Sequence, residues 1–198
     1  MNRAERRSAL RTAPRSTATP RPTVQARIAD AVHHTVCDVT GADGVGQCTL
    51  YAAIGNALMN AVLADGNYAL QAGSMSVRLN RAGDRLSFDT DAAACEGRVG
   101  LEFHAWIAAP RGDDAEIVDL TARHWPTWAA RAGFAWDLPH PGAYLWMRTS
   151  KLNCDRAQYR AEYAPTRLVR DAITETYGES FEQMCRRALR LFNDGGAP

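Results

Sequence analysis

The sequence predicts an α+β fold in which helices precede and follow a group of strands. Apolar residues recur at helical spacing in residues 23–39 and 48–64, and again in 155–194. Between them lie short segments rich in β-forming residues, separated by turn residues. The connections are too short for crossover helices, which favours an antiparallel sheet. The order helix, helix, sheet and helix is typical of the α+β class.

The composition indicates a single globular domain. Of the 198 residues, 46% are apolar and 23% are charged, and the net charge of +1 gives no general attraction to nucleic acid. No segment approaches the roughly 20 apolar residues that a membrane-spanning helix needs. We therefore expect one folded domain over residues 27–198, with neither a membrane nor a nucleic acid as its partner.

Residues 1–26 are expected to form a disordered, arginine-rich arm. Residues 1–27 hold seven arginines, one acid and three prolines, with no apolar run. An alternative is that this arm holds a nucleic acid or an acidic protein. A secretory signal needs an apolar middle region, which residues 1–27 lack. We therefore expect a cytoplasmic protein with reduced thiols.

The first two predicted helices differ in how much of their surface is apolar. Helix 23–39 has a single apolar face, formed by Val24, Ile28, Val32 and Val36. Helix 48–64 is apolar around much of its circumference, which predicts a central, buried position. A glycine-containing loop, 40–46, separates the two, and Gly66 is expected to terminate the second helix.

Five strands are predicted, at residues 69–79, 85–90, 101–108, 116–120 and 143–148. The third shows the clearest alternation. Phe103, Ala105 and Ile107 should share one face of the sheet, and His104 and Trp106 the other. After the strands, residues 155–194 are expected to be helical, ending at Gly195 and Gly196.

Cys48 is the candidate nucleophile. It follows the glycine-containing loop and opens the central helix. A helix N-terminus has unpaired amide donors and a partial positive charge, and both favour thiolate over thiol. The Cys48 amide would also point to where an oxyanion develops. The alternative is a buried cysteine with a structural role.

His104 and Asp119 are the candidates to act with Cys48. His104 lies on a predicted strand and can serve as a general base for a thiol. Asp119 lies on the next strand among apolar neighbours, and a buried carboxylate needs a partner. Adjacent antiparallel strands can place the two side by side, so that Asp119 orients the imidazole. The alternatives are a structural histidine and a turn aspartate.

Three motifs follow one another along the chain: Gly46-Gln47-Cys48, His104-Ala105-Trp106 and Val118-Asp119-Leu120-Thr121. Their order and spacing resemble the transglutaminase-like branch of the papain-fold cysteine enzymes, and specifically its small bacterial families. The resemblance implies a papain-like core, in which the helix carrying Cys48 packs on an antiparallel sheet. It also implies that Cys48 is the nucleophile, His104 the base and then the acid, and Asp119 the residue that orients the imidazole.

Two details of the resemblance concern the neighbours of Cys48. Gln47 matches the glutamine before the nucleophile of animal transglutaminases, and is placed beside the oxyanion. Thr49 stands where an aromatic residue commonly follows the nucleophile. The chain has no room for the calcium-binding regions of the animal enzymes, which argues against calcium-dependent crosslinking.

The resemblance implies a thiol hydrolase or acyl transferase that acts on a peptide, protein or small amide through a thioester. An alternative is a catalytically inactive binding module of the same fold. Trp106, Trp125 and Trp128 are expected to line the substrate cleft, or else to pack in the core.

We expect neither a cofactor nor a metal. His33 and Cys37 lie one helical turn apart, but a metal site needs three or four ligands. The spacing of the remaining cysteines and histidines does not complete such a set.

Overall fold

The computed structural model describes residues 22–64, 66–89 and 103–195, and within them the fold is α+β. The described residues form four α-helices: α2 (Val24–Thr40), α3 (Cys48–Val62), α4 (Trp125–Arg131) and α5 (Tyr163–Asn193). Six strands form one antiparallel sheet: β1 (Ala69–Arg78), β2 (Arg85–Phe88), β3 (His104–Arg111), β4 (Asp114–Asp119), β5 (Leu145–Arg148) and β6 (Ala157–Ala161). The predicted class and the antiparallel sheet are therefore confirmed.

The long strand β1 organises the sheet. The order of strands is β2-β1-β3-β4-β5, and β6 also pairs with β1. Gly73 is the register partner of both His104 on β3 and Ala161 on β6. Two residues further on, Met75 is paired with both Phe88 and Tyr159. The middle of β1 thus gathers residues from three strands that lie far apart in the sequence.

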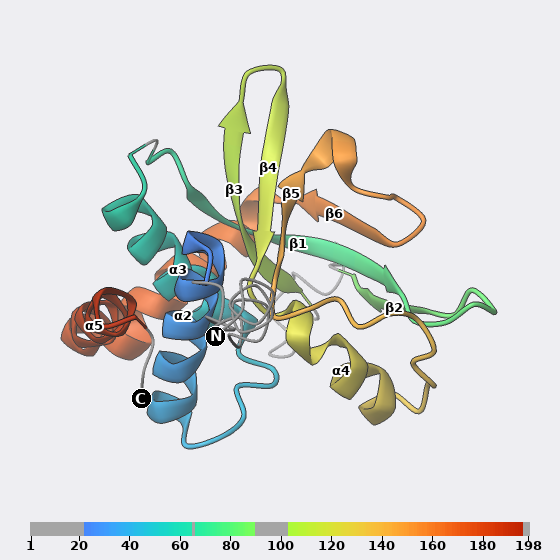
Figure 1. Cartoon of the computed structure of the whole chain (residues 1–198), viewed down its shortest axis with the longest axis horizontal. Helices are drawn as coiled ribbons and strands as arrows, with labels where there is room; N and C mark the ends of the chain where they lie inside the picture. The colour runs from blue at the N-terminus through green and yellow to red at the C-terminus, as the bar shows by residue number, and fades with distance from the viewer. Residues whose placement is uncertain (1–21, 65, 90–102, 196–198) are drawn as a thin grey trace, which may run out of the picture.

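Helices α2, α3 and α5 lie together on one side of the sheet, and α4 lies apart from them (Figure 1). The core between this helical layer and the sheet includes Ile54 and Leu58 of α3, which pack with Ile107 of β3 and Val118 of β4. Gly55 permits the close approach, because a Cβ there would lie 2.5 Å from the Leu120 side chain. The apolar second helix is buried, as its sequence predicts.

The opposite face of the sheet carries a second cluster of buried side chains. It includes Trp106 and Met75, with Trp125 and Ala129 from the region of α4. Ala105 and Ile107 belong instead to the helix-covered core. The predicted alternation along the third strand is therefore confirmed.

Helix α2 begins one residue after the start that the helical spacing predicts, and it overlaps the end of the expected arm. Thr23 caps α2 by accepting a hydrogen bond from the Ala26 amide, so the helix begins at Val24. Residues 24–26, which we assigned to the arm, belong to this helix. Residues 1–21 of the expected arm lie outside the described residues.

Helix α3 ends at Val62, so Gly66 does not terminate it as expected. The Asn60 side chain explains the earlier end. Its amide group donates to the Tyr68 carbonyl at 2.9 Å, and its oxygen accepts from the Tyr68 amide at 3.1 Å. These bonds tie the last turns of α3 to the start of β1.

The largest correction concerns residues 155–194, which are not all helical. Residues 157–161 form β6, because their backbone completes pairing with β1. Ala157 is buried while Gln158 and Arg160 are exposed, and this alternation is too short to stand out in the sequence. Helix α5 follows, with non-helical backbone angles at Gly178, and ends at Asn193.

Three of the described prolines lie inside regular elements rather than in loops: Pro110, Pro126 and, in the first turn of α5, Pro165. Pro126 occupies the first turn of α4, where its missing N–H is not needed. Pro110 lies in β3, beyond Ala108, where the pairing of β3 with β1 ends. All five predicted strands are present with shifted ends, and residues 90 and 101–102 of their predicted ranges lie outside the described residues.

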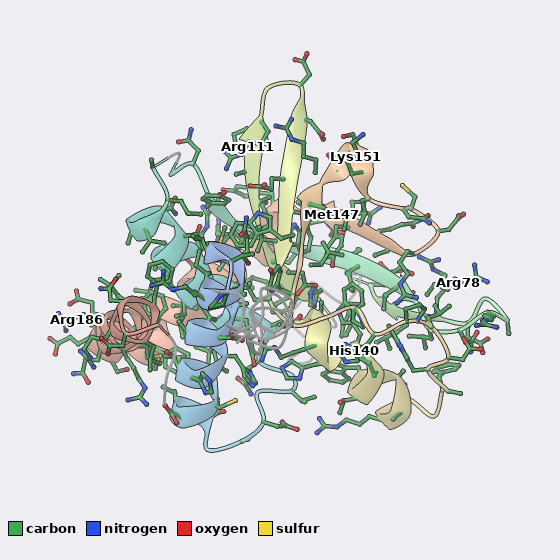
Figure 2. The ribbon with its side chains drawn as sticks, viewed as in Figure 1. Arg78, Arg111, His140, Met147, Lys151 and Arg186 are labelled. Atoms are coloured by element: carbon green, nitrogen blue, oxygen red, sulfur yellow. The ribbon has the colours of Figure 1, made fainter. Side chains whose placement is uncertain are left out.

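Charged side chains surround the periphery of the molecule. Figure 2 shows Arg78, Arg111, Lys151 and Arg186 on different sides of it. Among the described helices, none combines the length and the apolar character that crossing a membrane requires.

Candidate active site

Cys48 is the first residue of α3, with Gln47 as its N-cap. The preceding loop includes Gly44 and Gly46, whose φ angles are +79° and +87°. At Gly44 a Cβ would lie 2.5 Å from the Tyr51 hydroxyl, so both backbone conformation and space favour glycine. The loop therefore delivers Cys48 to the end of a helix where several amide groups have no intrahelical acceptor.

The structure brings Cys48 and His104 into contact. Burial raises the pKa of the Cys48 thiol, but a hydrogen bond with His104 and the positive charge of the imidazolium outweigh it. A hydrogen bond from the Ala105 backbone adds to the effect, and the net pKa is lowered. The pKa of His104 is raised: burial opposes its charge, but the Asp119 carboxylate and the Cys48 thiolate stabilise it. The pair therefore favours thiolate and imidazolium.

Asp119, at the end of β4, is fully buried and fully partnered. Its Oδ2 accepts a hydrogen bond from His104 Nε2 at 2.8 Å and another from the Tyr159 hydroxyl at 2.9 Å. Its Oδ1 accepts from the Thr121 amide at 2.8 Å and the Thr121 hydroxyl at 2.6 Å. Burial raises the pKa of Asp119, but the charge and hydrogen bond of His104 and the bonds from Thr121 lower it overall. Nδ1 is then the imidazole nitrogen left for Cys48.

Aromatic rings hold the imidazole in place. Trp106 is nearly parallel to His104, with ring centroids 6.3 Å apart. Tyr159 and Phe88 lie 6.2 and 5.4 Å from it. Trp106 is buried in the second cluster and is not among the residues that line the pocket, which agrees with the alternative that it packs in the core. It lies two residues after His104 on β3, so its buried ring supports the imidazole from the same face of the strand.

A pocket of about 390 Å³ opens over Cys48 and His104. Its apolar lining comprises Leu86, Phe88, Phe103, Trp125, Trp128 and Ala132. Trp128 and Trp125 both contribute to this lining, and the buried Trp125 also packs in the second cluster. Gln47 is not among the lining residues, because its position at the helix cap leaves Gly46 and Cys48 to face the pocket.

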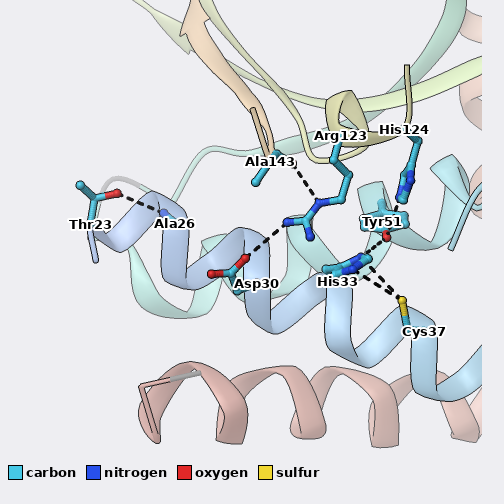
Figure 3. A network of polar contacts seen from close by, with 9 residues as sticks. All are labelled: Thr23, Ala26, Asp30, His33, Cys37, Tyr51, Arg123, His124 and Ala143. Carbon is cyan, nitrogen blue, oxygen red and sulfur yellow. Dashed lines mark hydrogen bonds and ion pairs between the residues drawn. The ribbon is translucent and has the colours of Figure 1, made fainter. Parts of the chain in front are cut away.

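A second polar cluster reaches the pocket from α2 (Figure 3). The Tyr51 hydroxyl bridges His33 Nδ1 at 2.5 Å and His124 Nε2 at 3.0 Å. Burial lowers the pKa of His33 to about 4 with help from Arg123, and the same two causes lower the pKa of His124. Both imidazoles are therefore neutral near pH 7. His124 itself lines the pocket, which adds a polar neutral group to its wall.

Cys37 lies at the outer end of this cluster, with its sulfur 3.6 Å from His33 Nδ1. Within the described part of the chain, no group of three or more His, Cys, Asp or Glu side chains is arranged to hold a metal ion. Cys95 lies outside the described residues.

Sequence reasoning missed Tyr159 and His124 as neighbours of the site. Tyr159 lies in a segment that we expected to be helical, and only the pairing of β6 with β1 brings its hydroxyl to Asp119. His124 follows Asp119 by five residues, yet it belongs to no motif that would have identified it. Thr121 belonged to a quoted motif, and its spacing of two residues from Asp119 is the signal of a side-chain turn.

Comparisons with known proteins support the fold alone. No protein-family model matches the chain, and no curated protein matches it. A solved crystal structure of a genomics target is similar, with a TM-score of 0.57 and 15% sequence identity. The similarity spans 85% of this chain and 78% of the other.

Proposed function

We propose that this protein is a cysteine hydrolase or acyl transferase that cleaves an amide bond through a thioester on Cys48. The observation that carries the proposal is the chain of contacts from Cys48 to His104 to Asp119 at the floor of an apolar pocket. We propose further that the core is papain-like and belongs to the transglutaminase-like branch, on the strength of the three motifs. Thr49 departs from that pattern.

The first half of the reaction forms the thioester. The Cys48 thiolate attacks the substrate carbonyl carbon, and the carbonyl electron pair moves to oxygen. Amide groups at the start of α3, including that of Cys48, can stabilise this oxyanion. As the intermediate collapses, the carbon–nitrogen bond breaks and His104 donates its proton to the leaving amine.

The second half releases the acyl group. Neutral His104 takes a proton from water or from an acceptor amine, which attacks the thioester carbonyl. The carbon–sulfur bond breaks, Cys48 leaves as thiolate, and His104 is again protonated. Water gives hydrolysis and an amine gives transfer. Asp119 keeps the imidazole oriented and stabilises its positive charge throughout. A reduced Cys48 is required, which agrees with the cytoplasmic location that we propose.

The test is the pH dependence of alkylation by iodoacetamide, with mass spectrometry to locate each modified cysteine. Because its pKa is lowered, Cys48 should react about tenfold faster than the exposed Cys154 at pH 6. His104→Ala should remove this advantage, because the thiolate loses its charge partner. Cys154→Ser, which leaves the site intact, should leave the rate of Cys48 alkylation at pH 6 unchanged.

Two outcomes of this experiment would contradict the proposal. One is slow alkylation of Cys48 at a rate similar to that of Cys154. The other is fast alkylation that His104→Ala leaves unchanged. Either would favour a catalytically inactive binding module of this fold.

A further inference from the structure

We infer that the acyl side of the substrate carries a planar apolar group next to a carboxylate, held between the aromatic wall of the pocket and Arg131. The inference rests on the proposed function, because it names the substrate class of the same site. Three observations carry it: a run of rings from His104 to Arg131, the apolar character of the lining, and the charge of the lining groups.

A continuous series of ring contacts connects the imidazole to a guanidinium. Phe88 lies 5.4 Å from His104 between ring centroids. Trp128 meets Phe88 edge to face, with centroids 5.8 Å apart and planes at 89°. The Arg131 guanidinium carbon lies 5.9 Å from the centre of Trp128. All four residues line the pocket, so a group beside the reacting carbonyl would contact the rings before it reaches Arg131.

The rings favour a flat apolar substituent. Phe103 and Trp125 add further apolar surface to the lining. Gly46 lines the pocket beside Trp128, and a Cβ there would be in ordinary contact with the indole at 3.5 Å. Aromatic surfaces gain most from a planar partner that stacks or meets them edge to face.

Among the described residues that line the pocket, the net positive charge lies at the end formed by Arg131. Within the described residues, no acidic side chain lines the pocket. The thiolate and imidazolium of Cys48 and His104 balance each other, and His124 is neutral because burial and Arg123 lower its pKa. Arg131 therefore provides the net charge.

Among the described residues, the carboxylate that pairs with Arg131 leaves the guanidinium available to a ligand. Asp43 approaches the guanidinium at 4.0 Å, and both side chains are more than half exposed. An exposed ion pair at that distance is weak. A guanidinium binds carboxylate groups through its paired N–H donors, so a substrate carboxylate can compete with Asp43.

The test compares two alkylating probes that differ in one group. The probes are 4-(iodoacetamido)benzoate and 4-(iodoacetamido)benzamide, and iodoacetamide provides the reference without a ring. The rate of modification of Cys48 is followed by mass spectrometry at pH 7 and low salt. We expect the benzoate to react roughly two- to fivefold faster than the benzamide, as one exposed charge pair allows.

Three variants separate the contributions to this ratio. Arg131→Gln should bring the benzoate-to-benzamide ratio close to one. Arg186→Gln, which removes an exposed arginine of α5 far from α4, should leave the ratio unchanged (Figure 2). Trp128→Ala should slow both ring-bearing probes relative to iodoacetamide.

Two results would overturn the inference: a benzamide that reacts as fast as the benzoate, or a ratio that survives Arg131→Gln. A faster reaction with a cationic analogue would indicate a substrate of the opposite charge. The proposed function is tested separately, by the rate at which iodoacetamide modifies Cys48 at pH 6. The ratio between the two ring-bearing probes tests only the substrate class.

Discussion

At the scale of single residues, the site depends on a buried carboxylate that has no unsatisfied oxygen. Asp119 accepts from His104 and Tyr159 through one oxygen and from Thr121 twice through the other. Burying an unpaired carboxylate would cost several kcal/mol, so these donors are what permits its charge in the core. The same charge then holds His104 as an imidazolium beside Cys48.

Asp119→Asn should lower the free energy of unfolding by about 3–5 kcal/mol at pH 7, because it removes one partner of a buried charge pair. The folded pKa of Asp119 is lowered below its unfolded value by His104 and Thr121, despite burial. Its contribution is therefore present above about pH 4 and is lost as the pH falls through the folded pKa. The difference between wild type and variant should shrink from pH 5 to pH 3 in urea unfolding.

The exposed residue Asp171 provides a control for this pH dependence. Asp171→Asn should change stability by less than about 1 kcal/mol across the same range. A difference between wild type and Asp119→Asn that stays constant down to pH 3 would show that Asp119 is not a carboxylate with a lowered pKa.

At the scale of elements, the site depends on how closely three strands approach the middle of β1. His104 begins β3, Phe88 ends β2, and Tyr159 lies in β6. Each is held in register with Gly73 or Met75. The meeting of these strands, rather than any one of them, places the aromatic support around the imidazole.

Gly73→Ala should disturb this meeting point. A Cβ at residue 73 would lie 2.1 Å from the Arg160 carbonyl oxygen and 3.0 Å from the Glu162 amide nitrogen. Backbone atoms of a paired strand cannot move aside as a flexible side chain can. We expect a loss of about 1–3 kcal/mol in the free energy of unfolding, measured in urea.

Gly66→Ala is the matched control, because its added Cβ would lie no closer than 3.4 Å to its neighbours. It should leave stability unchanged or raise it slightly. Equal stability of the two variants would argue that β6 does not lie against β1 at this point.

At the scale of the whole molecule, the two halves of α5 complete the helical layer. Thr166 binds the backbone of Ala72 on β1 through its hydroxyl, at 2.9 and 3.1 Å. Beyond the break at Gly178, Met184 and Ala188 pack in the core with α2 and α3. Helix α5 therefore stabilises α3, the helix that carries Cys48. Among the described residues that line the pocket, none comes from α5.

Met184→Ala should lower the free energy of unfolding by about 2–5 kcal/mol, because it leaves a cavity in the helical layer. The ratio of Cys48 to Cys154 alkylation should not change under conditions where the variant stays folded. Leu189→Ala, at a more exposed position of the same helix, should cost much less. Comparable losses in the two variants would contradict the packing of α5 on α2 and α3.

Local patterns in the sequence were enough to predict the elements that carry the three candidate residues. The glycine-containing loop and apolar spacing placed Cys48 at a helix start, and alternation placed His104 on the face opposite Ile107. Asp119 among apolar neighbours indicated a buried, partnered carboxylate. These features depend on the spacing of residues that are close together in the sequence. They can therefore be recognised without knowledge of the tertiary structure.

By itself, then, the sequence determined the α+β class, the strand and helix faces and the candidate trio. Only the tertiary structure decided that Tyr159 completes the bonds to Asp119, that Trp106 supports His104, and that His124 reaches the pocket. The physical reason is that pairing between distant segments arises from backbone hydrogen bonds. Every non-proline residue can make those bonds, so no local pattern of side chains specifies them.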